Sequence, residues 1–223
     1  MKSNSNIFFL VAVLSTGNYL GNNPDNKKTT ELYLPSSGLS CKLPSMPDAR
    51  YGHTVESTGL ICGGYPTAAH SQDSSCLMWN KGSWEEYLTL KVKRRKHVSW
   101  TPGSGIGTYL IGGEESPSTT TLIAPNGTQQ ENPFTLKYGT MLACAFEDPD
   151  TDTLIITGGL GIGNIVSVYT TLGWRADLPR LNQPRQSHAC TSYTSSGKKV
   201  KIKLEECGLQ GVLKLSVSGY VSG

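Results

Sequence analysis

The segment Leu154-Ile155-Ile156-Thr157-Gly158-Gly159 decides the fold, because an apolar strand ending in two glycines occurs three times in the chain. The other copies are Leu60-Ile61-Cys62-Gly63-Gly64 and Tyr109-Leu110-Ile111-Gly112-Gly113. The glycine pairs are spaced 49 and 46 residues apart, from 63 to 112 and from 112 to 158. Glycine here allows a backbone approach in which any Cβ would collide. The chain is therefore predicted to consist of one repeated unit.

Two further markers keep nearly the same period. A turn glycine follows an apolar segment at intervals of 44, 45 and 46 residues, as Gly38, Gly82, Gly127 and Gly173. An Arg-x-x-His pattern occurs as Arg50/His53, Arg94/His97 and Arg185/His188. Lys137 and Thr140 are assigned to the missing copy, which gives steps of 44, 43 and 48 residues. Three independent markers with one period make chance a poor explanation.

Each unit is predicted to hold four short strands separated by turn signals. In the first unit these strands cover 53–56, 60–62, 76–79 and 84–88, and Lys81-Gly82-Ser83 forms the tight turn between the last two. No sustained helical periodicity appears in the repeated region. A period of 43–49 residues with four strands is typical of a β-propeller blade, so the fold class is all-β.

These motifs resemble the kelch repeat over roughly residues 30–200. The resemblance rests on Arg-x-x-His before the first strand, the apolar-Gly-Gly end of the second, and the tryptophan after the turn glycine (Trp84, Trp174). The second unit departs from it, since Thr128-Gln129 stands where the tryptophan is expected. The chain looks most like the secreted, cysteine-containing kelch proteins of invertebrates. The resemblance implies structural roles for Gly63, Gly64, Gly112, Gly113, Gly158, Gly159, Arg50, His53, Arg94, His97, Arg185, His188, Trp84 and Trp174.

The ends of the repeated region, 30–204, are predicted to be partial blades. Residues 30–47 supply only a third and fourth strand, and 185–204 only a first and second. Three full blades with these halves either stay incomplete or close as a four-bladed ring, the low limit for propellers. Open strand edges would favour self-association. Residues 18–29 form a short polar segment and 205–223 an atypical tail.

The first 17 residues are predicted to be a secretory signal peptide. Lys2 precedes an apolar run over 7–14, which is far shorter than the ~20 residues that span a bilayer. Ser15 and Gly17 place small residues before a cut after Gly17. The alternative interpretation is a buried first strand. We expect an extracellular protein with no membrane span.

Six cysteines fit disulfides in an oxidising compartment, and their spacing lacks a zinc-ligand pattern. Cys62 ends a second strand and Cys76 begins the antiparallel third, so these two are expected to pair. Cys144 and Cys190 fall at matching places of neighbouring first strands and form a second expected pair. The bonding of Cys41 and Cys207 stays open. Asn126-Gly127-Thr128 is the only N-glycosylation sequon, in a predicted turn.

Charge points to no particular partner, since 20 basic and 17 acidic residues give a formal net charge of +3 and nucleic acid is not expected. The basic run 91–97 is read as a solvated connector, with polysaccharide or phosphate contact as the alternative. The acidic run 147–152 is read as a solvated hairpin tip, because Thr153 occupies the place where a calcium loop needs glycine. His53, His97 and His188 share one repeat position and are expected to be scaffold residues and not metal ligands.

The function expected from the sequence is a secreted, kelch-type binding module that contacts an unidentified protein or glycan through its loops. We expect no catalysis and no cofactor, because no nucleophile–base or metal set can be assembled from the residues. One alternative is an enzyme of the galactose oxidase or propeller-lyase kind acting on carbohydrate. Another is a disulfide-linked structural component of an extracellular assembly.

Overall fold

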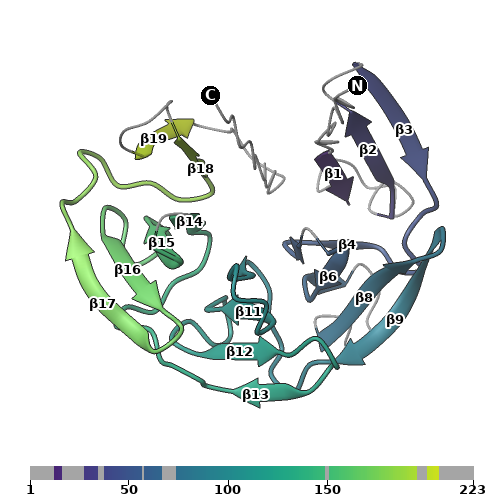
Figure 1. Ribbon diagram of the computed structural model, residues 1–223, viewed down its shortest axis with the longest axis horizontal. Coiled ribbons are helices and arrows are strands. Elements are labelled where there is room, and N and C mark those ends of the chain that lie inside the picture. The colour runs from purple at the N-terminus through teal and green to yellow at the C-terminus, as the bar shows by residue number, and fades with distance from the viewer. Residues whose placement is uncertain are drawn as a thin grey trace, which may run out of the picture.

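The computed structural model describes residues 13–16, 28–34, 38–56, 58–66, 74–148, 151–194 and 200–205. Within these ranges every regular element is a β-strand, and every strand pairing is antiparallel. Figure 1 shows the sheets arranged around a common centre as an open arc, with β3, β9, β13 and β17 on the outside. The all-β class expected from the sequence is confirmed, and the arrangement is propeller-like.

Three complete four-stranded sheets form the middle of the arc. The first holds β5 (Thr54–Val55), β6 (Leu60–Cys62), β8 (Ser75–Asn80) and β9 (Ser83–Thr89). The second holds β10 (Val98–Trp100), β11 (Thr108–Ile111), β12 (Thr120–Ile123) and β13 (Gln129–Glu131). The third holds β14 (Cys144–Asp148), β15 (Thr153–Thr157), β16 (Val166–Thr170) and β17 (Gly173–Leu178). The strands predicted for the first unit match the first sheet to within one or two residues at each end.

Two smaller sheets flank the complete ones. At the N-terminal side β1 (Val13–Thr16), β2 (Thr30–Leu34) and β3 (Leu39–Leu43) form a three-stranded sheet. At the C-terminal side β18 (Ala189–Thr194) pairs with β19 (Val200–Glu205). A short ladder of β4 (Arg50–Tyr51) and β7 (Tyr65–Pro66) completes the elements, and it was not expected from the sequence.

The terminal sheets differ from the sequence expectation in one strand and one connection. Strand β1 falls inside the predicted signal peptide and pairs with β2, from Val13 opposite Tyr33 to Thr16 opposite Thr30. Among the described strands the N-terminal and C-terminal sheets are separate, so the four-bladed closure is not seen. Figure 1 shows these two sheets on either side of the opening of the arc. Residues 1–12, 17–27 and 206–223, with Cys207, lie outside the described residues.

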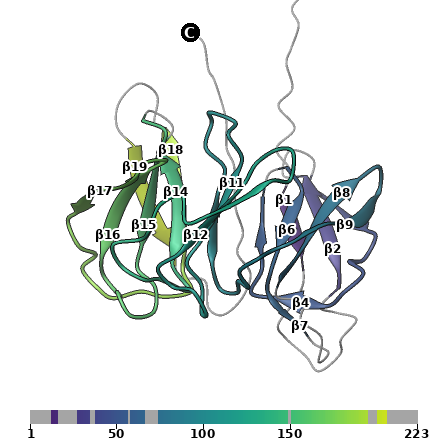
Figure 2. The same ribbon diagram turned by 90° about the horizontal axis from the view of Figure 1, so that it is seen from below.

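The hydrophobic core lies between neighbouring sheets, as a radial array of sheets requires. The contact of the second and third complete sheets buries the largest cluster, which contains Trp100, Tyr109, Phe134, Leu136, Leu154 and Tyr169. Trp100 stacks on Tyr109 with ring centroids 5.2 Å apart. Figure 2 shows the sheets side by side, with β4 and β7 at the lower edge. Burial between sheets fixes their relative positions through apolar area removed from water.

Both expected cysteine pairs are disulfides in the structure. Cys62 at the end of β6 is bonded to Cys76 on β8, within one sheet. Cys144 on β14 is bonded to Cys190 on β18 and joins the third complete sheet to the C-terminal sheet. Cys41 on β3 is exposed and has a free thiol.

Candidate functional site

One face of the arc is built by a turn that precedes the first strand of each sheet. The four turns span 50–53, 94–97, 140–143 and 185–188. The third residue of each turn has a positive φ, at Gly52 (68°), Lys96 (55°), Leu142 (55°) and Ser187 (52°). We call the surface formed by these turns and by the residues after the Gly-Gly pairs the turn face.

Backbone hydrogen bonds connect the turns directly to one another. The amide of Lys96 donates to the carbonyl of Gly52 over 2.8 Å, and the amide of Leu142 donates to Lys96 over 2.9 Å. The amide of Ser187 donates to Leu142 over 2.8 Å. This continuous run of bonds connects the backbone of the turn face from sheet to sheet.

The Gly-Gly pairs form the joint between each sheet and the next turn. The second glycine donates its amide to the first residue of that turn, from Gly64 to Arg94, Gly113 to Thr140 and Gly159 to Arg185. A Cβ on the first glycine would meet the same carbonyl, at 2.1 Å for Gly63 and Arg94. The same approach is 2.4 Å for Gly112 and 2.5 Å for Gly158. The close approach expected from the sequence is confirmed, and its partner is the following turn.

These joints correct the assignment of the third turn. The spacing predicts Lys137 and Thr140 at the Arg and His positions, and the structure shows that this prediction is wrong. The carbonyl of Thr140 accepts a hydrogen bond from the amide of Gly113, as the carbonyls of Arg94 and Arg185 do from the second glycines of their own pairs. Thr140 and Ala143 therefore occupy the Arg and His positions of the third turn. The steps between turns become 44, 46 and 45 residues. Side-chain identity could not locate this turn in the sequence, because it contains neither the arginine nor the histidine of the repeat.

The arginines of the first two turns are buried supports. Arg94 donates to the carbonyls of Gly112 and Thr119 and to the hydroxyls of Thr119 and Thr121. Arg50 donates to the carbonyls of Gly63 and Ser75 and to the hydroxyl of Ser75. Burial lowers the pKa of both guanidinium groups to about 10. Each arginine therefore binds the loop between the second and third strands of its own sheet.

The three repeated histidines are buried, and His97 and His188 contact the neighbouring sheet. His97 Nε2 lies 2.9 Å from the hydroxyl of Thr54, and His188 Nε2 lies 2.8 Å from that of Thr157. Burial, helped by Arg50 and Arg94 respectively, lowers the pKa of His53 and His97 to about 3, and burial also lowers that of His188. The described residues contain no group of three His, Cys, Asp or Glu side chains arranged to hold a metal ion.

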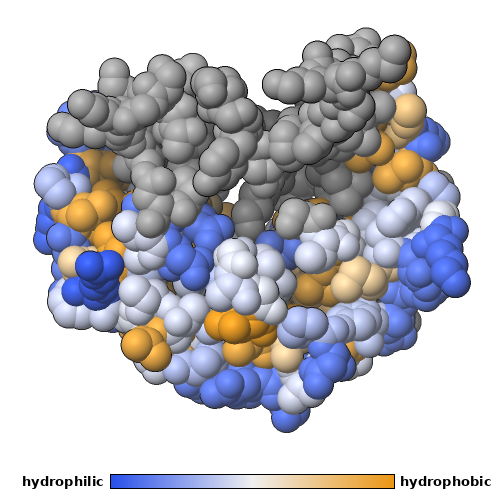
Figure 3. Space-filling model, viewed as in Figure 1, coloured by the Kyte–Doolittle hydropathy of each residue, from blue (hydrophilic) through white to orange (hydrophobic). Residues whose placement is uncertain are grey.

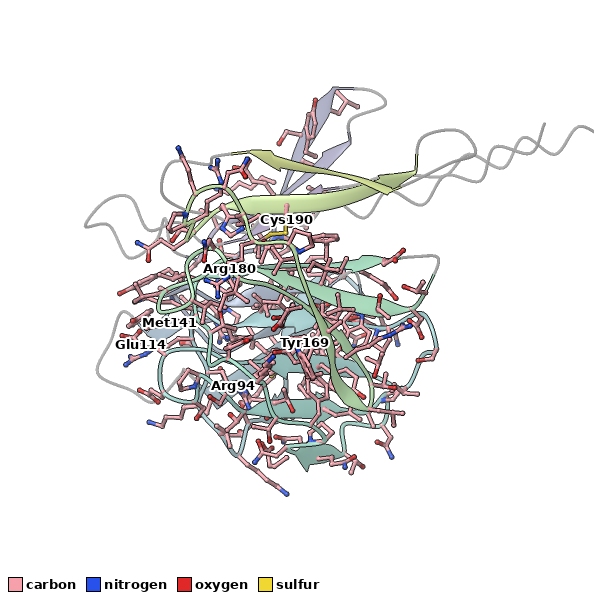
Figure 4. The ribbon with its side chains drawn as sticks, turned by 90° about the vertical axis from the view of Figure 1, so that its left-hand side faces the viewer. Arg94, Glu114, Met141, Tyr169, Arg180 and Cys190 are labelled. Carbon is pink, nitrogen blue, oxygen red and sulfur yellow. A yellow bond between two sulfur atoms is a disulfide. The ribbon has the colours of Figure 1, made fainter. Side chains whose placement is uncertain are left out.

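Between these supports, the turn face carries side chains that differ from sheet to sheet. The second turn position holds Tyr51, Arg95, Met141 and Gln186, and the position after Gly-Gly holds Tyr65, Glu114 and Leu160. Figure 4 shows Glu114 and Met141 together at one edge of the molecule, with Arg94 nearer its interior. A repeated scaffold with unlike side chains on one face is the arrangement expected of a recognition surface.

The first two turns bring a compact aromatic and charged cluster together on this face. Tyr51 stacks on Tyr65 with ring centroids 4.7 Å apart, and the Arg95 guanidinium lies 4.3 Å from the Tyr65 ring centroid. The Tyr65 hydroxyl donates to Glu114, which also pairs with Lys96 Nζ at 3.1 Å. Arg95 pairs with Glu115 at 3.0 Å. The hydrogen bond from Tyr65, together with Lys96, lowers the pKa of the Glu114 carboxyl.

The basic run 91–97 is thus divided among several roles. Arg94 and His97 are buried supports, whereas Arg95 and Lys96 are partly exposed and paired with carboxylates. Of the acidic run 147–152, residues 149–150 lie outside the described residues. Glu147 on β14 and Asp152, just before β15, each accept a hydrogen bond of 3.2 Å from the amide of Gly103. That contact joins neighbouring hairpin loops away from the turn face.

The two repeated tryptophans occupy different environments. Trp84 is buried and donates to the Pro44 carbonyl over 3.1 Å, which ties the first complete sheet to the N-terminal sheet. Trp174 is 44% exposed, donates to Asp177 and carries Lys137 Nζ at 4.0 Å from its ring centroid. The hydrogen bond from Lys137, with that from Trp174, lowers the pKa of Asp177. Trp84 is therefore a support, and Trp174 contributes to the surface.

The glycosylation sequon at Asn126 lies away from the turn face. Asn126 is exposed in the turn between β12 and β13, where its side-chain oxygen accepts a hydrogen bond from the Thr128 amide. Figure 3 shows the face seen in Figure 1, where apolar and polar residues are interspersed over the described part. No helix among the described residues is long and apolar enough to cross a bilayer.

Comparison with known proteins supports the fold alone. No family model matches the chain, and no curated protein matches its sequence. A solved structure titled "Structure of YjhT" is similar with a TM-score of 0.63 and 13% sequence identity. The similarity covers 89% of this chain and 82% of that one. At this identity a shared fold does not transfer function.

Proposed function

We propose that this protein is an extracellular, kelch-type recognition module that binds a protein or a glycan through the turn face and catalyses no reaction. The observation that carries the proposal is the contrast within each turn. Buried supports such as Arg50 and Arg94 repeat, whereas the neighbouring residues Tyr51 and Arg95 on the same turns differ and are partly exposed.

The composition of the turn face suits recognition. Tyrosine and arginine are enriched at the energetic centres of protein interfaces, because they combine a large contact area with hydrogen bonding. Tyr51, Tyr65 and Arg95 already form one stacked unit, so little side-chain entropy is lost when a partner covers them. Glu114 and Lys96 offer both charge signs beside that unit.

Three features support the extracellular part of the proposal. The first 17 residues fit a signal peptide, and the disulfides Cys62–Cys76 and Cys144–Cys190 fit an oxidising compartment. The Asn126 sequon lies in an exposed turn, where an oligosaccharyltransferase could reach it.

A direct test is to express the chain in a secreting cell line and to probe arrays of defined glycans and purified extracellular domains. We expect saturable binding to one class of ligand, weakened at least tenfold by Tyr65→Ala. Leu172→Ser in the exposed β16–β17 turn is the matched control and should leave affinity unchanged. Stoichiometric copper in the purified chain, with oxidation of a sugar alcohol, would contradict the proposal and favour the galactose oxidase-like alternative.

The exposed thiol of Cys41 favours a second candidate function, a disulfide-linked component of an extracellular assembly. In that case the secreted protein should migrate as a disulfide-linked dimer without reductant, and Cys41→Ser should convert this dimer to the monomer. A monomer under both conditions would eliminate this candidate and leave the recognition module.

A further inference from the structure

The N-terminal sheet contains the third and fourth strands of a blade. In each complete sheet, a residue that follows the fourth strand donates its amide to a carbonyl just before the third strand. The residue two positions after that carbonyl serves below as the reference position of the third strand. Leu90 donates to Ser74, Leu136 to Ser118 and Leu181 to Asn164 in this way. Met46 makes the same bond to Lys28. This alignment gives Thr30 on β2 the position of Cys76 on β8, Thr120 on β12 and Val166 on β16.

Strand β1 therefore occupies the place of a second strand. In the complete sheets, the residue opposite that position is the last of the second strand, as Cys62 opposite Cys76 and Thr157 opposite Val166. In the N-terminal sheet, Thr16 lies opposite Thr30. The next residue, Gly17, precedes Gly63 by 46 residues and continues the Gly-Gly period toward the N-terminus.

The C-terminal sheet contains the complementary half, a first and a second strand. Ala189 pairs with Glu205, as Val98 pairs with Ile111 and Cys144 with Thr157 in the complete sheets. Glu205 is thus the residue that the repeat would place opposite Thr30. Thr16 of β1 and Glu205 of β19 correspond to one and the same position on the inner edge of β2.

We propose that the inner edge of β2 is a strand-binding site, filled by β1 in the unprocessed chain and by β19, with Glu205 opposite Thr30, after residues 1–17 are removed. The proposal rests on the secretion included in the proposed function, because signal cleavage is what removes β1. An edge of unpaired amides and carbonyls is a template for another strand. β19 of the same chain is the committed occupant, since it flanks the same opening and is covalently tethered at high effective concentration (Figure 1).

The exchange joins two half-blades into one four-stranded sheet ordered β18-β19-β2-β3. For this to happen the two terminal sheets must approach each other across the opening, and the contacts between neighbouring sheets must readjust. Processing would thereby convert an open arc into a closed ring of four sheets, within the known range of propellers.

The native disulfide Cys62–Cys76 shows that two cysteines can be bonded at the pair of repeat positions that Glu205 and Thr30 would occupy. An engineered disulfide between residues 30 and 205 can therefore report the exchange. The Thr30→Cys/Glu205→Cys variant, with Cys41 and Cys207 changed to Ser, is expressed as the full chain in secreting cells. Oxidised glutathione accepts the two electrons and two protons as the thiols form the disulfide. Peptide mapping without reductant then identifies the bond, and N-terminal sequencing of the same sample reports cleavage.

The expected result is a secreted protein that begins at Asn18 and contains an intramolecular 30–205 disulfide in most molecules. Leu32→Cys/Lys203→Cys should also cross-link and keeps the buried hydroxyl of Thr30, which guards against misfolding of the first variant. The off-register pair Leu32→Cys/Glu205→Cys should cross-link at least tenfold less. A Gly17→Leu variant that blocks cleavage should abolish the 30–205 bond and permit a 16–30 bond in Thr16→Cys/Thr30→Cys.

Each opposite result overturns the proposal in a distinguishable way. A secreted chain that retains Met1 shows that cleavage is not the trigger, and it also removes the signal peptide as a support for the proposed function. A chain that begins at Asn18 without the 30–205 bond overturns the exchange and leaves the recognition function intact. A 30–205 bond found only between two copies overturns closure within one chain and indicates exchange between chains.

Discussion

The second turn, Arg94–His97, and the third, Thr140–Ala143, have the same backbone and different side chains. Lys96 and Leu142 have the same φ of 55°, and both turns accept the amide of a preceding glycine. The second turn also has a buried arginine with five side-chain hydrogen bonds and a buried histidine. The third turn has neither. The backbone joint therefore defines the repeat, and the arginine and histidine reinforce it.

The joint shared by both turns should tolerate change least. Gly63→Ala places a Cβ 2.1 Å from the Arg94 carbonyl at a φ of 66°, so we expect a loss of about 4 kcal/mol in the free energy of unfolding. Gly82→Ala is the control, with a φ of 95° and nothing within 4 Å, and should cost about 1 kcal/mol. Urea denaturation measures both. Equal losses would show that conformational strain, and not the joint, sets the requirement for glycine.

Removing the support that distinguishes the turns should have the next largest effect. Arg94→Ala removes five hydrogen bonds and takes the guanidinium donor from the buried carbonyl of Gly112, so we expect a loss of about 3 kcal/mol. The matched Thr140→Ala removes a hydroxyl that has no hydrogen-bond partner and should cost about 0.5 kcal/mol or less. The same urea series compares them. A loss at Thr140 as large as that at Arg94 would contradict the division into joint and support.

His97 of the second turn should make the free energy of unfolding depend on pH, an effect that the third turn cannot contribute because it has no histidine. Burial holds the pKa of His97 at about 3, against about 6.5 in the unfolded chain, so the unfolded chain binds more protons between these values. Stability is then complete above about pH 6.5 and falls as the pH drops toward 3. His97 should account for about 2 kcal/mol of the loss between pH 7 and pH 5. Thermal unfolding of His97→Gln should show a flatter profile over this range, whereas Ala143→Ser should retain the wild-type profile.

The smallest expected effect concerns the third turn position. Leu142 adopts a φ of 55°, which disfavours a residue with a Cβ, whereas Gly52 holds the equivalent place in the first turn. Leu142→Gly relieves this strain but increases the entropy of the unfolded chain and loses some packing. We expect a net gain of about 0.5 kcal/mol, visible as a small rise in Tm. A loss of more than about 1 kcal/mol would show that the Leu142 side chain is a support in its own right.

Repetition made much of the fold predictable from the sequence. The glycine pairs and turn glycines located three complete sheets, and antiparallel geometry brought Cys62 to Cys76. The third turn was misassigned because its regularity is in the backbone, in a positive φ at a leucine, which composition cannot reveal. The segment that contains β1 was assigned to a signal peptide with a buried first strand as the alternative, since an apolar run of this length fits both a leader and a strand. The contact between Tyr65 and Glu114 joins two loops of neighbouring sheets, and no local pattern encodes it.

The most direct test of the central claim compares affinities on the two faces of the arc. The ligand identified in the array screen is titrated against Tyr65→Ala and Glu114→Lys on the turn face, and against Ile106→Ser and Leu172→Ser in exposed loops away from it. We predict that Kd rises at least tenfold for both turn-face variants and less than twofold for the others. Loss of binding only in Ile106→Ser or Leu172→Ser, with Tyr65→Ala and Glu114→Lys unaffected, would contradict recognition through the turn face.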